Sequence, residues 1–323
     1  MPTYRKTVSA EELRLMTKIA YLYHKRSQKQ SEIAYQLDLS QATVSRILKR
    51  AEEEGIVRIS VTIPTGVYTQ LEEELCEKYG LKAAIVVHCE DENDEAVFHH
   101  VGSAAAYYIE TTIGRNEIVG LSSWSSTLLA MVNSMHPLAK ASDAKVVQML
   151  GGMGNPSAEI YAARITEQFA ALVQGEPVYL PAPGLARSQD AHADLMADPF
   201  VREATAYFDK ISLAIVGIGS VEPSKLLQSS GNIFSEEELG ALQEAGAVGD
   251  VCLRFFNING EPVNLPLDKR VVSIPLEQLT QAKRIVGVAG GRRKLNAIRG
   301  AVNGKLINVL ITDHHSAQAL LDG

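Results

Sequence analysis

Between residues 30 and 50, polar side chains recur at spacings that would let them contact a nucleic acid. Gln, Thr and Ser side chains can hydrogen-bond base edges, while Arg and Lys can meet phosphates or guanine. The candidates for DNA contact are Gln30, Ser40, Gln41, Thr43, Ser45, Arg46, Lys49 and Arg50. The alternative is an ordinary helical hairpin whose polar face is simply solvated.

The spacing of apolar residues predicts that this segment forms two short helices joined by a tight turn. Ile33 and Leu37 are four residues apart and share a helix face, with the small Ala34 beside them. Asp38 tolerates the left-handed conformation of such turns, and Ser40 is a good N-cap for the second helix. In the second helix the residues expected to face inward are Val44, Ile47 and Leu48. The polar residues are then left outward, as in a helix-turn-helix whose second helix reads the major groove.

The flanking segments favour a complete DNA-binding module over an isolated hairpin. Residues 11–25 place Leu15, Ile19 and Leu22 at helical spacing and predict a third helix. Gly55 has the position of a glycine that ends a helix. Residues 56–63 alternate apolar and polar, which indicates a half-buried strand. Three helices and a strand predict a winged helix-turn-helix.

A second set of polar residues lies in a hydroxyl-rich loop that follows an apolar run. The segment 120–130 carries Ser123, Ser125, Ser126 and Thr127 where a helix is expected to begin. Backbone N–H groups at a helix N-terminus, together with hydroxyls, suit an anion such as phosphate. An N-capped helix would need only one of these serines, so the pattern favours a bound ligand.

Three further loops hold residues that could contact a small molecule. In 151–155, Gly152 lets the backbone approach a ligand and Asn155 can donate and accept hydrogen bonds, although a tight turn explains the glycines equally well. Asp250 could accept hydrogen bonds from sugar hydroxyls, or simply cap a turn. Lys294, expected on the first turn of a helix, can meet a phosphate, whereas Arg292 and Arg293 are expected to be solvated.

Alternating apolar runs and amphipathic segments predict how these loops are positioned. Strands are expected at 83–88, 116–122, 144–151, 177–182, 211–219, 251–257, 284–291 and 307–313. Helices are expected between them at 96–113, 157–173, 235–246 and 292–304. This alternation predicts an α/β fold with a doubly wound parallel sheet, in which ligands gather at the carboxyl ends of the strands.

Composition and charge divide the chain of 323 residues into parts. Residues 1–63 hold 11 basic and 7 acidic residues, whereas the remainder holds 20 basic and 31 acidic residues, so only the first part should attract DNA. We expect a DNA-binding domain at 1–63, a linker and helix at 64–81, and a ligand-binding domain at 82–323. Pro64 and Gly66 mark the first boundary.

Several classes of site and location are not expected from the sequence. The three widely spaced cysteines suggest a reduced cytoplasmic protein without a disulfide scaffold or zinc site. The histidines occur as the adjacent pairs 99–100 and 314–315, which do not form a metal signature, and no cofactor motif is present. No signal peptide or membrane-spanning run is found, so membrane association is not expected.

The segments 30–59, 180–183, 214–220, 230–251 and 287–313 together resemble the SorC/DeoR-type family of bacterial sugar-binding transcriptional regulators. The resemblance implies a winged helix-turn-helix followed by a Rossmann-like domain similar to sugar-phosphate isomerases and deaminases. It also implies a homotetramer on operator DNA, with a dimer as the fallback, and control by a sugar or sugar phosphate. In the implied site the loop after Gly120 holds phosphate, Lys294 binds it and Asp250 contacts the sugar.

One residue pair departs from the family pattern, and one other function remains open. Ser123 and Trp124 stand where relatives often have two glycines, so the indole would narrow the loop or stack on a ligand. The alternative function is a sugar-phosphate isomerase or deaminase with an accessory DNA-binding domain. Enzymatic chemistry would need a second acid or base beside Asp250, for which His136 and His192 are candidates by residue type alone. We therefore expect a regulator of a carbohydrate-use operon and not an enzyme.

Overall fold

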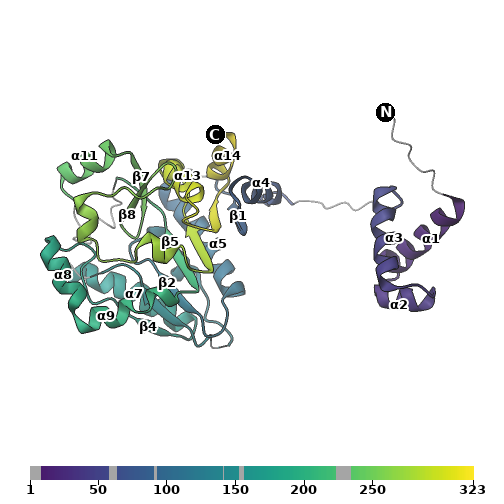
Figure 1. Cartoon of the computed structure of the whole chain (residues 1–323), viewed down its shortest axis with the longest axis horizontal. Coiled ribbons are helices and arrows are strands. Elements are labelled where there is room, and N and C mark those ends of the chain that lie inside the picture. Colours follow the sequence, from purple (N-terminus) through teal and green to yellow (C-terminus); the bar gives the residue numbers. More distant parts are fainter. Residues whose placement is uncertain (1–8, 58–63, 91–92, 141, 153–155, 223–233) are drawn as a thin grey trace. The chain divides into compact units, whose positions relative to one another are not determined.

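The computed structural model describes residues 9–57, 64–90, 93–140, 142–152, 156–222 and 234–323, with the side chains of 156–162 left out. Contacts within the chain divide it into two units, Met1–Ile63 and Pro64–Gly323, which are described separately (Figure 1). Within the described parts, no helix combines the length and the apolar character that crossing a membrane requires.

The first unit is built from helices that close around a small apolar core. These are α1 (Ala10–Ala20), the π-helical turn η1 (Tyr21–Lys25), α2 (Gln30–Gln36) and α3 (Gln41–Glu53). Ile33, Val44 and Leu48 are buried as expected. The expectation for Leu15 is wrong, because its side chain is 36% exposed and Met16 occupies the core instead. Met16 and Ile19 lie three residues apart on the face of α1 that packs against α2 and α3.

The turn and the caps of the helix-turn-helix form as their residue types predict. Asp38 adopts a left-handed conformation with φ 55° between the two helices. The Ser40 hydroxyl caps α3 by accepting a hydrogen bond from the backbone N–H of Thr43 at 3.1 Å. Gly55 follows the end of α3 with φ 71°. The strand expected over 56–63 falls mostly on 58–63, which lie outside the described residues.

The second unit is organised around a parallel sheet that has seven strands among the described residues. The strands are β1 (Ala83–Val87), β2 (Ile118–Leu121), β3 (Lys145–Gln148), β4 (Glu176–Val178), β5 (Leu213–Gly217), β9 (Arg284–Val288) and β10 (Val309–Asp313). Their order across the sheet is β1-β10-β9-β5-β2-β3-β4, and every pairing is parallel. The predicted doubly wound α/β fold is confirmed.

Helices cover both faces of this sheet (Figure 1). Among the described residues, the helices of the unit are α4 (Thr69–Tyr79), α5 (Asp94–Thr112), α6 (Ser126–Ser134), α7 (Pro156–Leu172), α8 (Gln189–Ala197), α9 (Pro199–Thr205), α11 (Glu236–Glu244), α12 (Leu276–Leu279), α13 (Leu295–Asn303) and α14 (His314–Asp322), with short 3-10 turns at η2 (Phe208–Lys210), η3 (Pro266–Arg270) and η4 (Arg292–Lys294). Strand β5 shows why both faces must be covered. Leu213 and Ile215 point into one apolar core, whereas Ala214 and Val216 point into the other.

A smaller antiparallel sheet corrects one expectation about the strands. It consists of β6 (Gly219–Ser220), β7 (Ala247–Val251) and β8 (Arg254–Asn257). The segment 251–257 is therefore not one strand of the parallel sheet, because Cys252 and Leu253 form a two-residue turn with φ 54° and 61°. Two successive left-handed residues reverse the chain, as in a type I′ hairpin.

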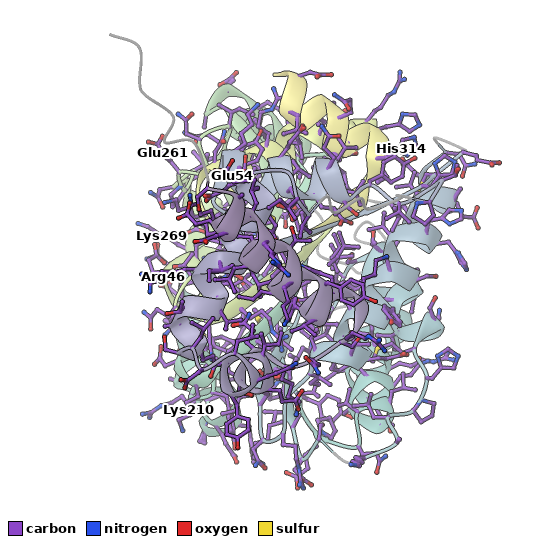
Figure 2. The ribbon with its side chains drawn as sticks, turned by 90° about the vertical axis from the view of Figure 1, so that its right-hand side faces the viewer. Arg46, Glu54, Lys210, Glu261, Lys269 and His314 are labelled. Atoms are coloured by element: carbon purple, nitrogen blue, oxygen red, sulfur yellow. The ribbon has the colours of Figure 1, made fainter. Side chains whose placement is uncertain are left out.

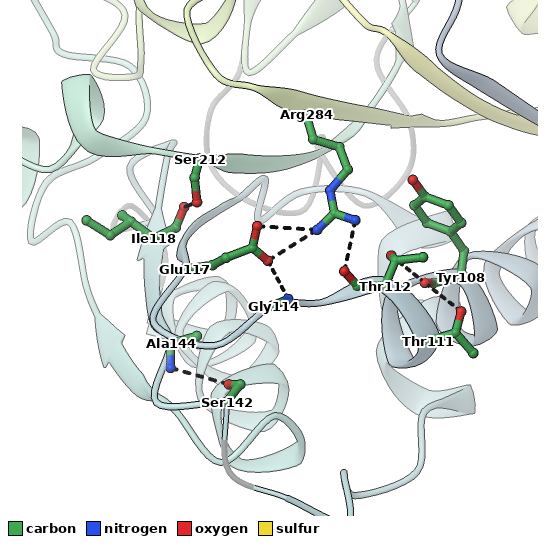
Figure 3. A network of polar contacts seen from close by, with 10 residues as sticks. All are labelled: Tyr108, Thr111, Thr112, Gly114, Glu117, Ile118, Ser142, Ala144, Ser212 and Arg284. Carbon is green, nitrogen blue, oxygen red and sulfur yellow. Dashed lines mark hydrogen bonds and ion pairs between the residues drawn. The ribbon is translucent and has the colours of Figure 1, made fainter.

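A polar network fixes the edge of the large sheet at which the strands begin (Figure 3). Arg284, the first residue of β9, donates to both carboxylate oxygens of Glu117 at 3.1 and 3.4 Å and to the Thr112 carbonyl at 3.0 Å. Glu117 also accepts the N–H of Gly114 at 2.8 Å. This half-buried ion pair ties the start of β9 to the loop that precedes β2.

Candidate functional site

A pocket lies at the carboxyl ends of the strands, where the order of the large sheet reverses. From β2 the chain proceeds to β3 and β4 on one side, whereas from β5 it proceeds to β9 and β10 on the other. The crevice between β2 and β5 is therefore the switch point at which open α/β sheets bind ligands. The pocket encloses about 610 Å³, counting its open mouth. It is lined by Phe98, Ser122, Trp124, Ser125, Ser126, Leu150, Gly217, Ile218, Gly219, Ser220, Glu222, Asp250, Cys252, Leu253, Arg293 and Lys294.

The serine loop after β2 brings the N-terminus of α6 to this pocket. Ser125 caps α6 by accepting the N–H of Leu128 at 3.3 Å. Ser125 and Ser126 line the pocket, as does Ser122, which was not predicted as a ligand contact. The side chains of Ser123 and Thr127 are fully buried and are not among the lining residues. The loop therefore offers fewer hydroxyls than expected, together with the first turn of a helix, where anions are stabilised.

Lys294 supplies a buried cation at the same pocket. It is the last residue of η4, directly before α13, and only 9% of it is exposed. Its Nζ lies 5.3 Å from the centre of the Phe98 ring on α5. Burial lowers the pKa of Lys294 to about 8, and the charge of Asp250 partly opposes that shift. The side chain is therefore mostly protonated at neutral pH and is poised to pair with an anion.

Asp250 supplies a carboxylate to the pocket from the antiparallel sheet. Its Oδ2 accepts the N–H of Leu253 at 2.9 Å, within the β7–β8 turn. Burial raises the pKa of Asp250 to about 6, while the hydrogen bond from Leu253 and the charge of Lys294 oppose this. Asp250 does not lie in a loop at the carboxyl end of the large sheet, where the predicted strand order would have placed the ligand contacts, since it belongs to β7 of the smaller sheet. The β7–β8 hairpin nevertheless brings Asp250 to the same pocket as Lys294.

Trp124 joins the serine loop to the neighbouring glycine loop. Its indole Nε1 donates to the carbonyl of Gly151 at 3.2 Å, and the residue is 8% exposed. Gly152 is buried beside this contact without lining the pocket, and Asn155 lies outside the described residues. Trp124 is the only tryptophan in the chain. No second tryptophan contributes to the emission, so tryptophan fluorescence reports on the pocket alone.

Several lining residues were not identified from the sequence. The end of β5 contributes Gly217 and the short strand β6 contributes Gly219 and Ser220, and the glycines after an apolar run were the available signal. A side chain at position 219 would collide with the carboxylate of Asp250. Arg293 is exposed as expected but also lines the pocket, with its guanidinium 3.6 Å from Asp94. Neither His136 nor His192 lines the pocket.

The candidate DNA contacts lie on α3 and at the start of α2. Gln41, Ser45, Arg46 and Lys49 are exposed (Arg46 is labelled in Figure 2), and Gln30 is the first residue of α2. Four of the candidates also make contacts within the unit. The Ser40 and Thr43 hydroxyls lie 2.8 Å apart, and Arg50 forms an ion pair with Glu12 at 3.3 Å. Arg46 Nη2 donates to the Thr43 hydroxyl at 3.3 Å.

Comparison with known proteins covers both units. Residues 65–322 match the family model described as "Putative sugar-binding domain", and residues 9–60 match the MarR family. A deoxyribonucleoside regulator of Bacillus subtilis is 34% identical over 97% of this chain and 98% of its own length. A sorbitol operon regulator of Klebsiella pneumoniae is 29% identical over 97% of this chain and 99% of its length. The crystal structure of the full-length sorbitol operon regulator SorC from that organism superposes with a TM-score of 0.72, at 29% identity, over 97% of this chain and 100% of that one.

Proposed function

Because this chain belongs to the SorC/DeoR-type family of bacterial sugar-binding transcriptional regulators, we propose that a phosphorylated sugar in its pocket changes its affinity for operator DNA. The chain is a transcriptional regulator with an N-terminal winged helix-turn-helix and a parallel-sheet sugar-binding domain, and its relatives are named as regulators and not as enzymes. The identity of the sugar, the residues that hold it and the assembly of the subunits belong to the proposal.

The observation that carries the proposal is the pairing of a buried lysine with a carboxylate in one pocket. Lys294 and the N-terminus of α6 complement a phosphate, since both present positive charge and N–H donors. Asp250 repels an anion but accepts hydrogen bonds from hydroxyl groups, so it suits the sugar. Ser125 and Ser126 add hydroxyls near the phosphate end, whereas Ser123 and Thr127 are buried outside the pocket lining. Trp124 offers a ring face on which a sugar can stack.

The names of the relatives suggest the first ligands to test. One relative is a deoxyribonucleoside regulator and another a sorbitol operon regulator. We therefore select 2-deoxyribose, sorbitol, 2-deoxyribose 5-phosphate and sorbitol 6-phosphate as probes. Trp124 fluorescence should report binding, and assays of isomerisation and deamination on the same samples should report turnover.

The proposal predicts that a phosphorylated probe binds without turnover. Loss of the phosphate should weaken binding at least about tenfold, since a charge-assisted hydrogen bond contributes about 1.5–3 kcal/mol. Lys294→Met should remove that preference, whereas Tyr107→Phe, on the exposed surface of α5, should retain it. Equal affinity for sugar and sugar phosphate would show that the phosphate is misassigned. Isomerisation or deamination of the bound sugar phosphate would instead favour the alternative function, a sugar-phosphate isomerase or deaminase.

The DNA-binding half of the proposal places the operator contacts in residues 1–63. Arg46, Gln41 and Ser45 are exposed on the first turns of α3, the part of a recognition helix that meets base edges. Lys49 lies one turn further on and is suited to a phosphate. The effector domain is assigned to residues 82–323, with 64–81 joining the two.

Assembly and location complete the proposal. Each helix-turn-helix reads a half-site, so joining several subunits on one operator raises affinity. We propose a homotetramer, with a dimer as the fallback, acting in the cytoplasm. Light scattering on the full chain, free and with operator DNA, tests this assembly. A monomer under both conditions would refute it.

A further inference from the structure

The segment that carries Lys294 is fastened to the N-terminus of α14. The Gly291 N–H donates to Asp313 Oδ2 at 2.7 Å and to the Ser316 hydroxyl at 3.1 Å. Asp313, which is 1% exposed, caps α14 through the Ser316 N–H at 2.9 Å and also accepts the Ser316 hydroxyl at 2.6 Å. The loop before Lys294 and the first turn of α14 therefore form one buried hydrogen-bonded unit.

A second contact fastens the helix that follows Lys294 to the middle of α14. Helix α13 begins at Leu295, immediately after the lysine, and Arg299 on this helix donates through Nη2 to the carbonyl of Ala319 at 2.8 Å. The lysine segment is thus attached to α14 on both its N-terminal and C-terminal sides. If a ligand displaced Lys294, the movement could therefore reach α14 through either the Gly291–Asp313 or the Arg299–Ala319 hydrogen bond.

Helix α14 lies beside α4 (Figure 1), and each end of α14 contacts α4 or Tyr68, the residue before α4. At its start, the His314 ring (His314 is labelled in Figure 2) stacks on Tyr68 at 5.1 Å between centroids and lies 4.9 Å from His88. The Tyr68 hydroxyl and His88 Nδ1 are 2.6 Å apart. At its end, the Leu320 carbonyl accepts from the Tyr79 hydroxyl at 2.7 Å and from Lys78 Nζ at 3.0 Å.

Tyr68 lies close in the chain to the boundary between the two units, so its contact with His314 links α14 to the segment that leads to the DNA-binding unit. It occupies the N-cap position of α4, without a side-chain capping hydrogen bond, and comes four residues after Pro64, the first residue of the second unit. The His314 ring is held by its other neighbours as well, because its Nδ1 accepts the N–H of Cys89 at 3.3 Å. Burial, then His315 and then His88 lower the pKa of His314, which keeps that nitrogen free to accept.

We propose that α14 transmits occupancy of the pocket to the segment that leads to the DNA-binding unit, with Asp313 as the input contact and the cluster of Tyr68, His88 and His314, joined by ring stacking and by the Tyr68 hydroxyl, as the output. The inference rests on the proposed function, because it takes the anion site at Lys294 as its starting point. A ligand shifts an equilibrium only through a difference in its interactions with two states. In this proposal the hydrogen bonds of Gly291 and Arg299 to α14 differ between the ligand-free and the ligand-bound state.

Hydrogen exchange of the full chain, with inorganic phosphate as the probe, tests the transmission. Amides of residues 64–72 are compared in phosphate and in chloride of equal ionic strength, while Trp124 fluorescence measures phosphate binding. In the wild type, saturating phosphate should change their exchange rates about fivefold or more, the lower end of allosteric couplings. Tyr68→Phe and His314→Leu should bind phosphate with a Kd within about twofold of wild type but lose the exchange response.

Two matched variants separate this role from a general effect of the substitutions. Tyr107→Phe and His100→Leu alter exposed residues of α5 and should keep the exchange response. Tyr68→Phe retains the ring and removes only the hydroxyl, so the test does not depend on the more severe His314→Leu. Transmission through α14 is refuted if phosphate saturates the Trp124 signal of the wild type while hydrogen exchange of residues 64–72 does not change. It is also refuted if Tyr68→Phe and His314→Leu show the same exchange response as the wild type. If phosphate gives no Trp124 signal in the wild type, the anion site itself fails and the transmission falls with it.

Discussion

Raising the pH should weaken binding of the sugar phosphate through a single side chain, Lys294. Burial lowers the pKa of this lysine to about 8, so its protonated form is lost at a lower pH than in solvent. The protonated fraction falls from about nine-tenths at pH 7 to about one-tenth at pH 9. If only the charged form pairs with phosphate, Kd should rise about tenfold over that interval, because the phosphate itself is already a dianion above its second pKa of about 6.

Titration of 2-deoxyribose 5-phosphate or sorbitol 6-phosphate into the protein, followed by Trp124 fluorescence from pH 7 to 9, measures this change. Lys294→Arg keeps its charge throughout and should give a nearly flat profile. Asp250→Asn should move the decline to lower pH, since the charge of Asp250 raises the pKa of Lys294. A flat wild-type profile, or an equal decline in Lys294→Arg, would refute the assignment of Lys294 as the phosphate-binding cation.

Other substitutions test separate parts of the structure. Asp250→Asn should weaken binding of the sugar phosphate about tenfold but leave inorganic phosphate bound as well or better, as fluorescence titration would show. Arg46→Ala should weaken operator binding by about 1–3 kcal/mol and relax its sequence preference, and Lys49→Ala should reduce the salt dependence of binding by about one phosphate contact. Glu117→Gln should lower the free energy of unfolding in urea by about 1–3 kcal/mol, because it removes the half-buried carboxylate in Figure 3. Arg115→Gln, at an exposed ion pair, should change it by less than about 1 kcal/mol.

Local residue types were sufficient to predict the helices of the first unit and the parallel sheet of the second, but not the smaller antiparallel sheet. Runs such as 211–217 are apolar at nearly every position because strands of this sheet are buried on both faces, and that property is visible without knowledge of partners. The turn at Asp38 and the cap at Ser40 depend on neighbours within four residues. Lys294 and Asp250 were predicted as ligand contacts because they follow glycine-rich turns, although capping a turn explained Asp250 equally well, and both line one pocket of the structure.

The parts that could not be predicted depend on contacts between distant segments or on backbone strain. Cys252 and Leu253 adopt positive φ values that residue type disfavours, so nothing in the sequence signals their turn. Phe98 reaches Lys294 from another part of the chain, which only the packing of α5 reveals. The prediction placed Leu15 in the core, whereas the structure buries its neighbour Met16, and the spacing of apolar residues along α1 is compatible with either.

Operator affinity with and without a sugar phosphate tests whether occupancy of the pocket controls DNA binding. Duplexes recovered by in vitro selection supply the operator, and fluorescence anisotropy measures its Kd with 2-deoxyribose 5-phosphate or sorbitol 6-phosphate at a concentration that saturates the Trp124 signal. The wild-type Kd should change at least about fivefold, whereas Lys294→Met should bind the same duplex with a Kd that does not respond. An operator Kd unchanged by a ligand that fills the wild-type pocket, or an equal response in Lys294→Met, would contradict the account.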